Sequence, residues 1–166
     1  MEGKFRSNSG LMCWCSSNAY QAIQRDRYDE TEAWQDQVAG IEHEAGPLTA
    51  GEDFIGLGLA SANCRWVGDR AKPMVYLFLA GSESDLGYLA ESAALDDFSI
   101  IDGVRLDCAS GNLVVFDPTG DPSRPLARLN VTNGTYLPYQ IRQMGEEGEA
   151  WMVVLFEEAF AERTFG

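Results

Sequence analysis

The fold class depends on residues 98–156, which read FSIIDGVRLDCASGNLVVFDPTGDPSRPLARLNVTNGTYLPYQIRQMGEEGEAWMVVLF. Six apolar or alternating runs in this stretch are typical of β-strands, at residues 98–101, 104–108, 113–116, 126–131, 136–144 and 151–156. Turn signals separate them, and Asn133-Gly134 is the strongest short hairpin signal among these. Because no gap is long enough for a crossover helix, we expect these strands to form an antiparallel meander.

Upstream of residue 98 the sequence mixes helix and strand patterns. Ser16-Ser17-Asn18 offers an N-cap for a short helix, and residues 29–44 repeat apolar side chains at helical spacing after a cap at Asp29 or Thr31. Gly46-Pro47 is expected to end that second helix. Further strands are predicted at residues 11–15, 54–60, 64–67 and 73–80, whereas residues 81–94 are ambiguous between a loop and a helical turn. Residues 1–166 are therefore expected to form one mainly β domain with one or two short N-terminal helices.

The chain is strongly acidic, with 26 Asp and Glu residues against 12 Lys and Arg residues and a net charge of −14. Such a field repels nucleic acids and anionic membranes, so we expect neither as a partner. It favours a basic protein partner, although excess carboxylate also serves solubility alone. No apolar run approaches the roughly 20 residues of a membrane span. Residues 1–7 lack the apolar core of a signal peptide, so a cytoplasmic location is expected.

The four cysteines leave three interpretations open. Cys13 and Cys15 would share one strand face about 7 Å apart, which is poor geometry for a bridge between them. Cys64 and Cys108 are isolated in the sequence, whereas zinc ligands usually come as closely spaced pairs. Reduced, partly buried thiols are the favoured interpretation, with a disulfide and a metal site as alternatives.

Groups able to carry catalysis are sparse. His43 is the only histidine, and no nucleophile motif accompanies it. Adjacent carboxylates are plentiful, but they occur at turn signals and do not define the facing pair that glycoside chemistry requires. Residues 117–123 lack the spaced ligands of a calcium loop. We therefore predict no catalytic residue, no cofactor and no metal.

Residues 110–118, SGNLVVFDP, and residues 133–136, NGTY, form a further pattern. They resemble the strand–loop–strand signature of a bacterial β-sandwich family of unknown function. Related-looking sandwiches occur among toxin-immunity proteins and competence-type nuclease inhibitors. The resemblance covers about a third of the chain and implies a β-sandwich with an inhibitor-like role. Because that family has no established active site, no functional residue is transferred from it.

The leading hypothesis is an immunity or inhibitor protein that neutralises a basic toxin such as a nuclease. Its carboxylates would pair with the Lys and Arg side chains that the toxin uses on phosphates. The candidate contact residues are Glu32, Trp34, Asp36, Asp96, Asp97, Glu146, Glu147 and Glu149. Trp34 is equally a candidate for the core. The alternatives are a ligand-binding or hydrolytic β-sandwich enzyme with a carboxylate-lined cleft, and a homo-oligomer formed through a sheet edge.

Overall fold

The structure, a computed structural model, describes residues 2–6, 9–40, 45–50, 52–58, 64–69, 74–79, 83–119, 123–146 and 148–166. These residues form a mainly β fold with two antiparallel sheets, which confirms the predicted fold class. His43, Glu147 and the side chain of Cys64 lie outside the described part.

The first sheet has the strand order β1-β5-β6-β12-β11-β7, and β8 also pairs with β11. Its strands are β1 (Glu2–Phe5), β5 (Cys64–Asp69), β6 (Met74–Leu79), β7 (Ser99–Ile100), β8 (Leu106–Cys108), β11 (Gly134–Gly145) and β12 (Gly148–Glu157). As its apolar sequence predicts, β6 is an interior strand, paired with β5 on one side and β12 on the other.

The second sheet has the order β10-β9-β2-β4-β3. Its strands are β2 (Leu11–Ser16), β3 (Ala45–Ala50), β4 (Glu52–Gly58), β9 (Asn112–Phe116) and β10 (Ala127–Asn130). Pro47 was expected to end a helix and instead lies within β3. Strand β3 is at the edge of this sheet, where proline is tolerated because no further strand needs a hydrogen bond from its nitrogen.

The predicted meander is wrong, because the second half of the chain passes repeatedly between the sheets. Among the described strands of this half, only β9–β10 and β11–β12 are consecutive strands that pair with each other. The turns around Gly111 and Asn133 connect strands of different sheets. The two turns are joined to each other, since the Val131 N–H donates to the Gly111 carbonyl at 2.9 Å. Gly111 has a φ of 74°, a conformation that glycine adopts without strain.

Four α-helices accompany the sheets, namely α1 (Ser17–Asp26), α2 (Glu32–Gly40), α3 (Glu83–Ser92) and α4 (Glu158–Phe165), with short 3-10 turns η1 (Tyr28–Glu30) and η2 (Leu95–Asp97). The two N-terminal helices confirm the prediction. The Ser16 hydroxyl accepts the Ala19 N–H at 3.1 Å, and the Thr31 hydroxyl accepts the Trp34 N–H at 3.2 Å, so both expected caps are present. The sequence prediction missed α4 and left α3 undecided.

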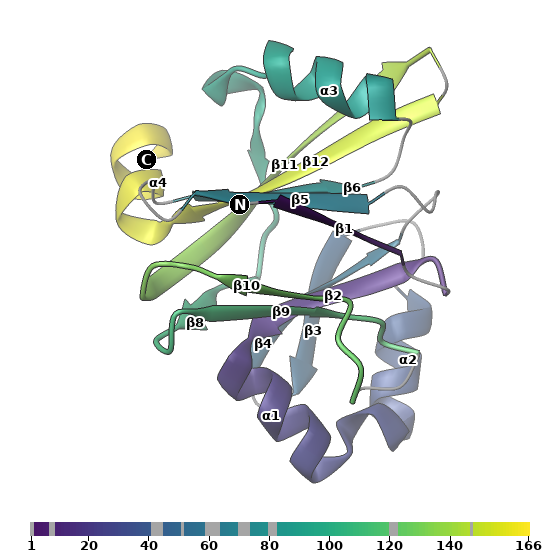
Figure 1. The fold of residues 1–166 in the computed structure, drawn as a ribbon. Helices are drawn as coiled ribbons and strands as arrows, with labels where there is room; N and C mark the ends of the chain where they lie inside the picture. Colours follow the sequence, from purple (N-terminus) through teal and green to yellow (C-terminus); the bar gives the residue numbers. More distant parts are fainter. Residues whose placement is uncertain are drawn as a thin grey trace.

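The helices cover the outer faces of the two sheets, as Figure 1 shows. Helices α3 and α4 lie on the first sheet, and α1 and α2 lie on the second. Strand β12 illustrates the layering through its alternating side chains. Trp151, Val153 and Leu155 belong to the large core that includes residues of both sheets. Val154 and Phe156 belong to a second apolar cluster beneath α3 and α4.

Among the described residues Cys13, Cys15 and Cys108 are buried, and none of the three forms a disulfide. Burial raises the pKa of the Cys13 thiol well above its ordinary value, and the neighbouring Cys15 and Asp117 add to the shift. A thiol that stays protonated and has no access to solvent is a poor nucleophile. These three cysteines therefore act as small apolar side chains of the core.

Asp117 follows β9, and its carboxylate makes hydrogen bonds that hold the start of the next loop. Its carboxylate accepts the Ser9 hydroxyl at 2.7 Å and the Thr119 N–H at 2.9 Å. Burial raises the pKa of Asp117, but these hydrogen bonds outweigh burial and leave the pKa below its ordinary value. Ionised Asp117 therefore stabilises the fold above pH 4, and this contribution is lost as the pH falls through the lowered pKa.

We expect Asp117→Asn to lower the free energy of unfolding by about 1–2 kcal/mol at pH 7, the usual range for lost hydrogen bonds to a charged group. The difference from the wild type should shrink at pH 3, because the Asp117 carboxyl of the unfolded chain, with its ordinary pKa of 3.8, is largely protonated there. Urea unfolding at both pH values measures it, with the exposed Asp102→Asn as control. An equal difference at pH 7 and pH 3 contradicts the prediction.

None of the helices that the structure describes is long and apolar enough to cross a membrane.

Candidate functional site

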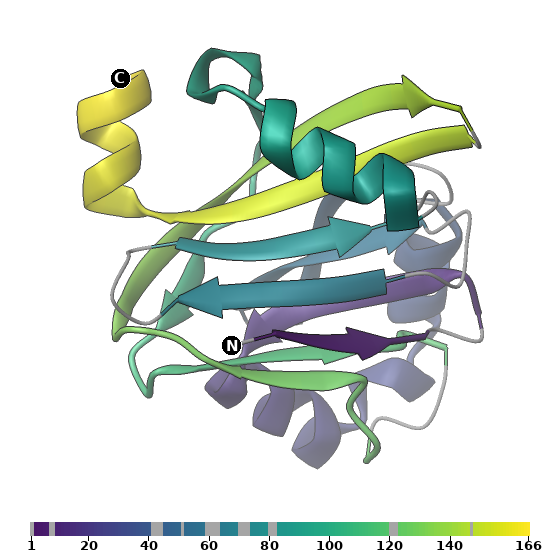
Figure 2. The ribbon, with the colours of Figure 1, turned by 45° about the horizontal axis from the view of Figure 1, so that its top comes forward.

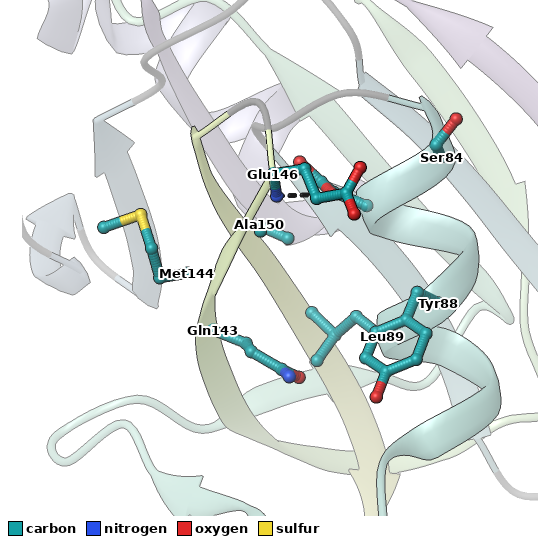
Figure 3. A pocket seen from close by; sticks show the side chains of 9 residues that line it. Ser84, Tyr88, Leu89, Gln143, Met144, Glu146 and Ala150 are labelled. Carbon is teal, nitrogen blue, oxygen red and sulfur yellow. Dashed lines mark hydrogen bonds between the residues drawn. The ribbon is translucent and has the colours of Figure 1, made fainter.

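A cleft of about 470 Å³ lies between helix α3 and the β11–β12 hairpin (Figure 3). It is lined by Ser84, Asp85, Tyr88, Leu89, Gln143, Met144, Gly145, Glu146 and Ala150. Leu89 and Ala150 are buried and belong to the apolar cluster on this face of the first sheet. The remaining lining residues are polar or exposed, so the cleft has an apolar floor and a polar rim.

Asp85 fastens the start of α3 to the tip of the hairpin. Its carboxylate accepts the backbone N–H of Glu146 at 3.1 Å. A Cβ atom at position 145 would collide with that carboxylate, so Gly145 allows the close approach. The cleft is therefore shaped by a hydrogen bond and a glycine at one end.

Large apolar side chains are exposed around this cleft and along the segment that follows α3. The exposed large hydrophobic residues of the described chain are Tyr88 (63%), Leu95 (44%), Ile100 (42%) and Met144 (75%). Tyr88, Leu95 and Ile100 lie on α3, η2 and β7, at the end of the molecule opposite α1 and α2 (Figures 1 and 2). Met144 lies near the end of β11, on the face of the hairpin turned away from α3 (Figure 3). Exposed apolar side chains concentrated in one region are typical of an interaction site.

The same region carries a large share of the negative charge. Residues 83–101 hold five carboxylates and no Lys or Arg, and residues 142–149 hold three carboxylates and one arginine. Together these 27 residues account for half of the net charge of −14. Arg142 is already engaged, because its guanidinium lies 4.1 Å from the centre of the Trp151 ring and 3.6 Å from the Glu149 carboxylate.

We call this region the α3–hairpin surface. It consists of Asp85, Tyr88, Glu91, Leu95, Asp96, Asp97, Ile100, Met144, Glu146 and Glu149. Four of the predicted contact residues lie in it and are exposed, namely Asp96, Asp97, Glu146 and Glu149. Asp97 also has a local role, since its carboxylate accepts the Ala94 N–H at 3.1 Å and caps η2.

Three other predicted contact residues, Glu32, Trp34 and Asp36, do not join this surface. Glu32 and Asp36 are exposed on α2, on the far side of the second sheet (Figure 1). Trp34 is 1% exposed, so the interpretation as an interaction anchor is wrong and the core alternative is correct. The two groups of carboxylates thus belong to separate regions of the molecule.

Asp85, Tyr88 and Met144 were not among the sequence candidates. Asp85 had a weak signal, because residues 83–101 lack any basic residue. Tyr88 and Met144 had none, because an exposed and a buried apolar residue look alike in a sequence.

Within the described residues no three His, Cys, Asp or Glu side chains are grouped so as to hold a metal ion. The two carboxylates that line the cleft are Asp85 and Glu146, and the first of these already accepts a backbone hydrogen bond. No family model matches the chain, and comparisons with curated proteins and with solved structures give no match either.

Proposed function

We propose that this protein is an acidic binding module that neutralises a basic protein partner, as an immunity or inhibitor protein of the cytoplasm does. The observation that carries the proposal is the coincidence of two properties on the α3–hairpin surface. Six carboxylates and the exposed large apolar residues of the described chain occur there. Charge steers a basic partner toward the surface, and apolar side chains supply contact area once it arrives.

The mechanism we infer is competitive occupation. Carboxylates such as Asp96 and Glu146 would pair with Lys and Arg side chains of the partner, and Tyr88 would be buried in the interface. If the partner uses those basic side chains to hold phosphates, its substrate is excluded. This function requires no catalytic group in the α3–hairpin surface.

The test is co-expression of the full chain with the product of the neighbouring gene, scored by rescue of growth and by co-purification. We expect Glu91→Lys with Asp96→Lys to slow association at least about tenfold, because steering depends on the local field. Both side chains are exposed, so the substitutions should leave the fold intact.

The matched control is Glu32→Lys with Asp36→Lys, which makes the same charge change on α2. This control should change the association rate less than about threefold, because it alters only the long-range part of the electrostatic attraction. If the double variant on α2 associates more slowly and the Glu91→Lys with Asp96→Lys variant does not, the partner binds at α2. If neither variant nor the wild type captures or neutralises the neighbouring product, the proposal is wrong.

One observation favours small-ligand binding as a second candidate function. The volume of about 470 Å³ between α3 and the hairpin lies within the usual range of ligand sites, and Ser84, Asp85 and Gln143 provide polar groups. A compound that raises the melting temperature of the wild type in a saturable way, but not that of Asp85→Asn, would support this second function.

A further inference from the structure

Strand β11 extends beyond β7 and β8, the two strands that pair with it on the side away from β12. On the side away from β12, β8 pairs with residues 134–136 of β11, and β7 pairs only with Tyr139 and Gln140. Residues 141–145 continue as strand and pair with β12. Among the described residues no strand pairs with their other side, so this end of β11 is an open sheet edge (Figure 2).

The backbone groups that face the open edge follow from the alternation along a strand. The Pro138 carbonyl accepts the Ile101 N–H at 2.9 Å, so the backbone of residue 138 faces away from β12. Every second residue from there has the same orientation, which places the N–H and C=O groups of Arg142 and Met144 at the open edge. The hairpin agrees, since Gly145 is paired with Gly148 of β12.

The side chains beside this edge leave it accessible. Arg142 is folded against Trp151 and Glu149, and it lies on the face opposite α3 together with Met144. Gln143 points toward α3, and Met144 points away from it (Figure 3). A strand added here would therefore place alternate side chains against Tyr88 on one face and Met144 on the other.

We propose that residues 141–145 of β11 receive an extended, Lys- and Arg-rich segment of the basic partner as an added β-strand. This inference rests on the proposed function and specifies how the partner is held. Main-chain hydrogen bonds to Arg142 and Met144 supply one part of the binding, and the carboxylates of the α3–hairpin surface select basic side chains.

Charge argues for a basic segment rather than a second copy of this chain. Two copies joined at this edge would bring together two surfaces that each carry six carboxylates. Three other sheet edges fit a basic strand less well. Strand β1 contains Lys4, β3 contains Pro47, and β10 contains the exposed Arg128.

The decisive variant is Met144→Pro in the full chain. Proline removes the N–H that faces the open edge and leaves the hydrogen bonds between β11 and β12 in place. Met144→Thr is the matched control, because it loses the same side chain and keeps the N–H. Equal urea midpoints for the two variants establish that both are folded.

The probe is a fluorescein-labelled, acetylated octapeptide of alternating Lys and Val, followed by fluorescence anisotropy. We expect the wild type to bind it, Met144→Pro to bind at least about tenfold more weakly, and Met144→Thr to remain within about threefold, as the loss of edge hydrogen bonds predicts. In NMR spectra of the wild type, peptide should protect the amides of Arg142 and Met144 from exchange. The Gln143 amide, which is directed at β12, should change little.

Each contrary outcome has a distinct meaning. If Met144→Pro binds the peptide as tightly as the wild type while Glu91→Lys with Asp96→Lys weakens it, strand addition is wrong and the proposed function stands. If the wild type does not bind the peptide but neutralises the neighbouring product, strand addition is again wrong. If light scattering shows a dimer that Met144→Pro converts to a monomer, the occupant is a second copy and the proposal is overturned.

Discussion

Trp34→Ala is expected to lower the free energy of unfolding by about 3–5 kcal/mol, the usual cost of deleting a large buried aromatic side chain. The Trp34 ring is stacked on Phe116 with the centroids 6.2 Å apart, and its indole N–H donates to the Pro118 carbonyl at 3.1 Å. The residue therefore joins α2 to the end of β9. Its removal leaves a cavity between helix and sheet and an unpaired carbonyl.

Urea unfolding monitored by circular dichroism measures this loss. Glu32→Ala, on the exposed face of the same helix, is the control and should change stability by less than about 0.5 kcal/mol. Affinity for the partner, measured where the variant is still folded, should be unchanged. A variant that stays stable but loses affinity would restore Trp34 as an interaction anchor.

Trp34 also shows where prediction from the sequence stops. The spacing of Trp34 and Val38 was sufficient to predict a helix, because helical periodicity is local. Whether the indole faces solvent or a sheet depends on Phe116, which is distant in sequence. The pattern could not choose between the two roles, and the packing of α2 on β9 determines the choice.

Strand positions were predictable for the same reason, whereas strand partners were not. Runs such as residues 113–116 and 151–156 lie within strands β9 and β12. The Asn133-Gly134 signal predicted a hairpin, but the hydrogen bond between Val131 and Gly111 joins two distant turns instead. Pairing between remote segments overrides a local turn preference.

Helix α4 had a signal that was overlooked. Ala161 and Phe165 are four residues apart in the helix, and the Phe160 and Phe165 rings lie 5.2 Å and 5.4 Å from the ring of Phe156 of β12, centroid to centroid. Glu157 and Glu158 are among the adjacent carboxylates that the sequence suggested for turns. They are in fact the last residue of β12 and the first of α4.

The acidic part of the candidate site was foreseeable and its apolar part was not. Asp96, Asp97, Glu146 and Glu149 were predicted because turn sequences place charged residues in solvent. Exposure of Met144 depends on β11 extending past β7, which is a property of the assembled sheet.

Phe156→Ala is the second substitution with a large expected effect, again about 3–5 kcal/mol of unfolding free energy. Phe156 is 1% exposed and lies at the centre of an aromatic cluster on the outer face of the first sheet. Its ring is 5.9 Å from Phe98, 5.5 Å from Tyr139 and 5.4 Å from Phe165, centroid to centroid. The substitution therefore removes the ring that contacts Phe160 and Phe165 of α4. It also removes the ring that supports Phe98, the residue after η2.

Phe156→Leu is the graded control, because leucine keeps most of the buried area and should cost less than about 1.5 kcal/mol. Urea unfolding ranks the three proteins, and limited proteolysis near residue 158 reports whether α4 has been released. Because Phe98 directly follows η2, Phe156→Ala should also weaken the binding of a basic partner, whereas Phe156→Leu should not. If Phe156→Ala retains wild-type stability and resists the protease, the aromatic cluster does not hold α4, and the acidic surface beside it does not depend on this core.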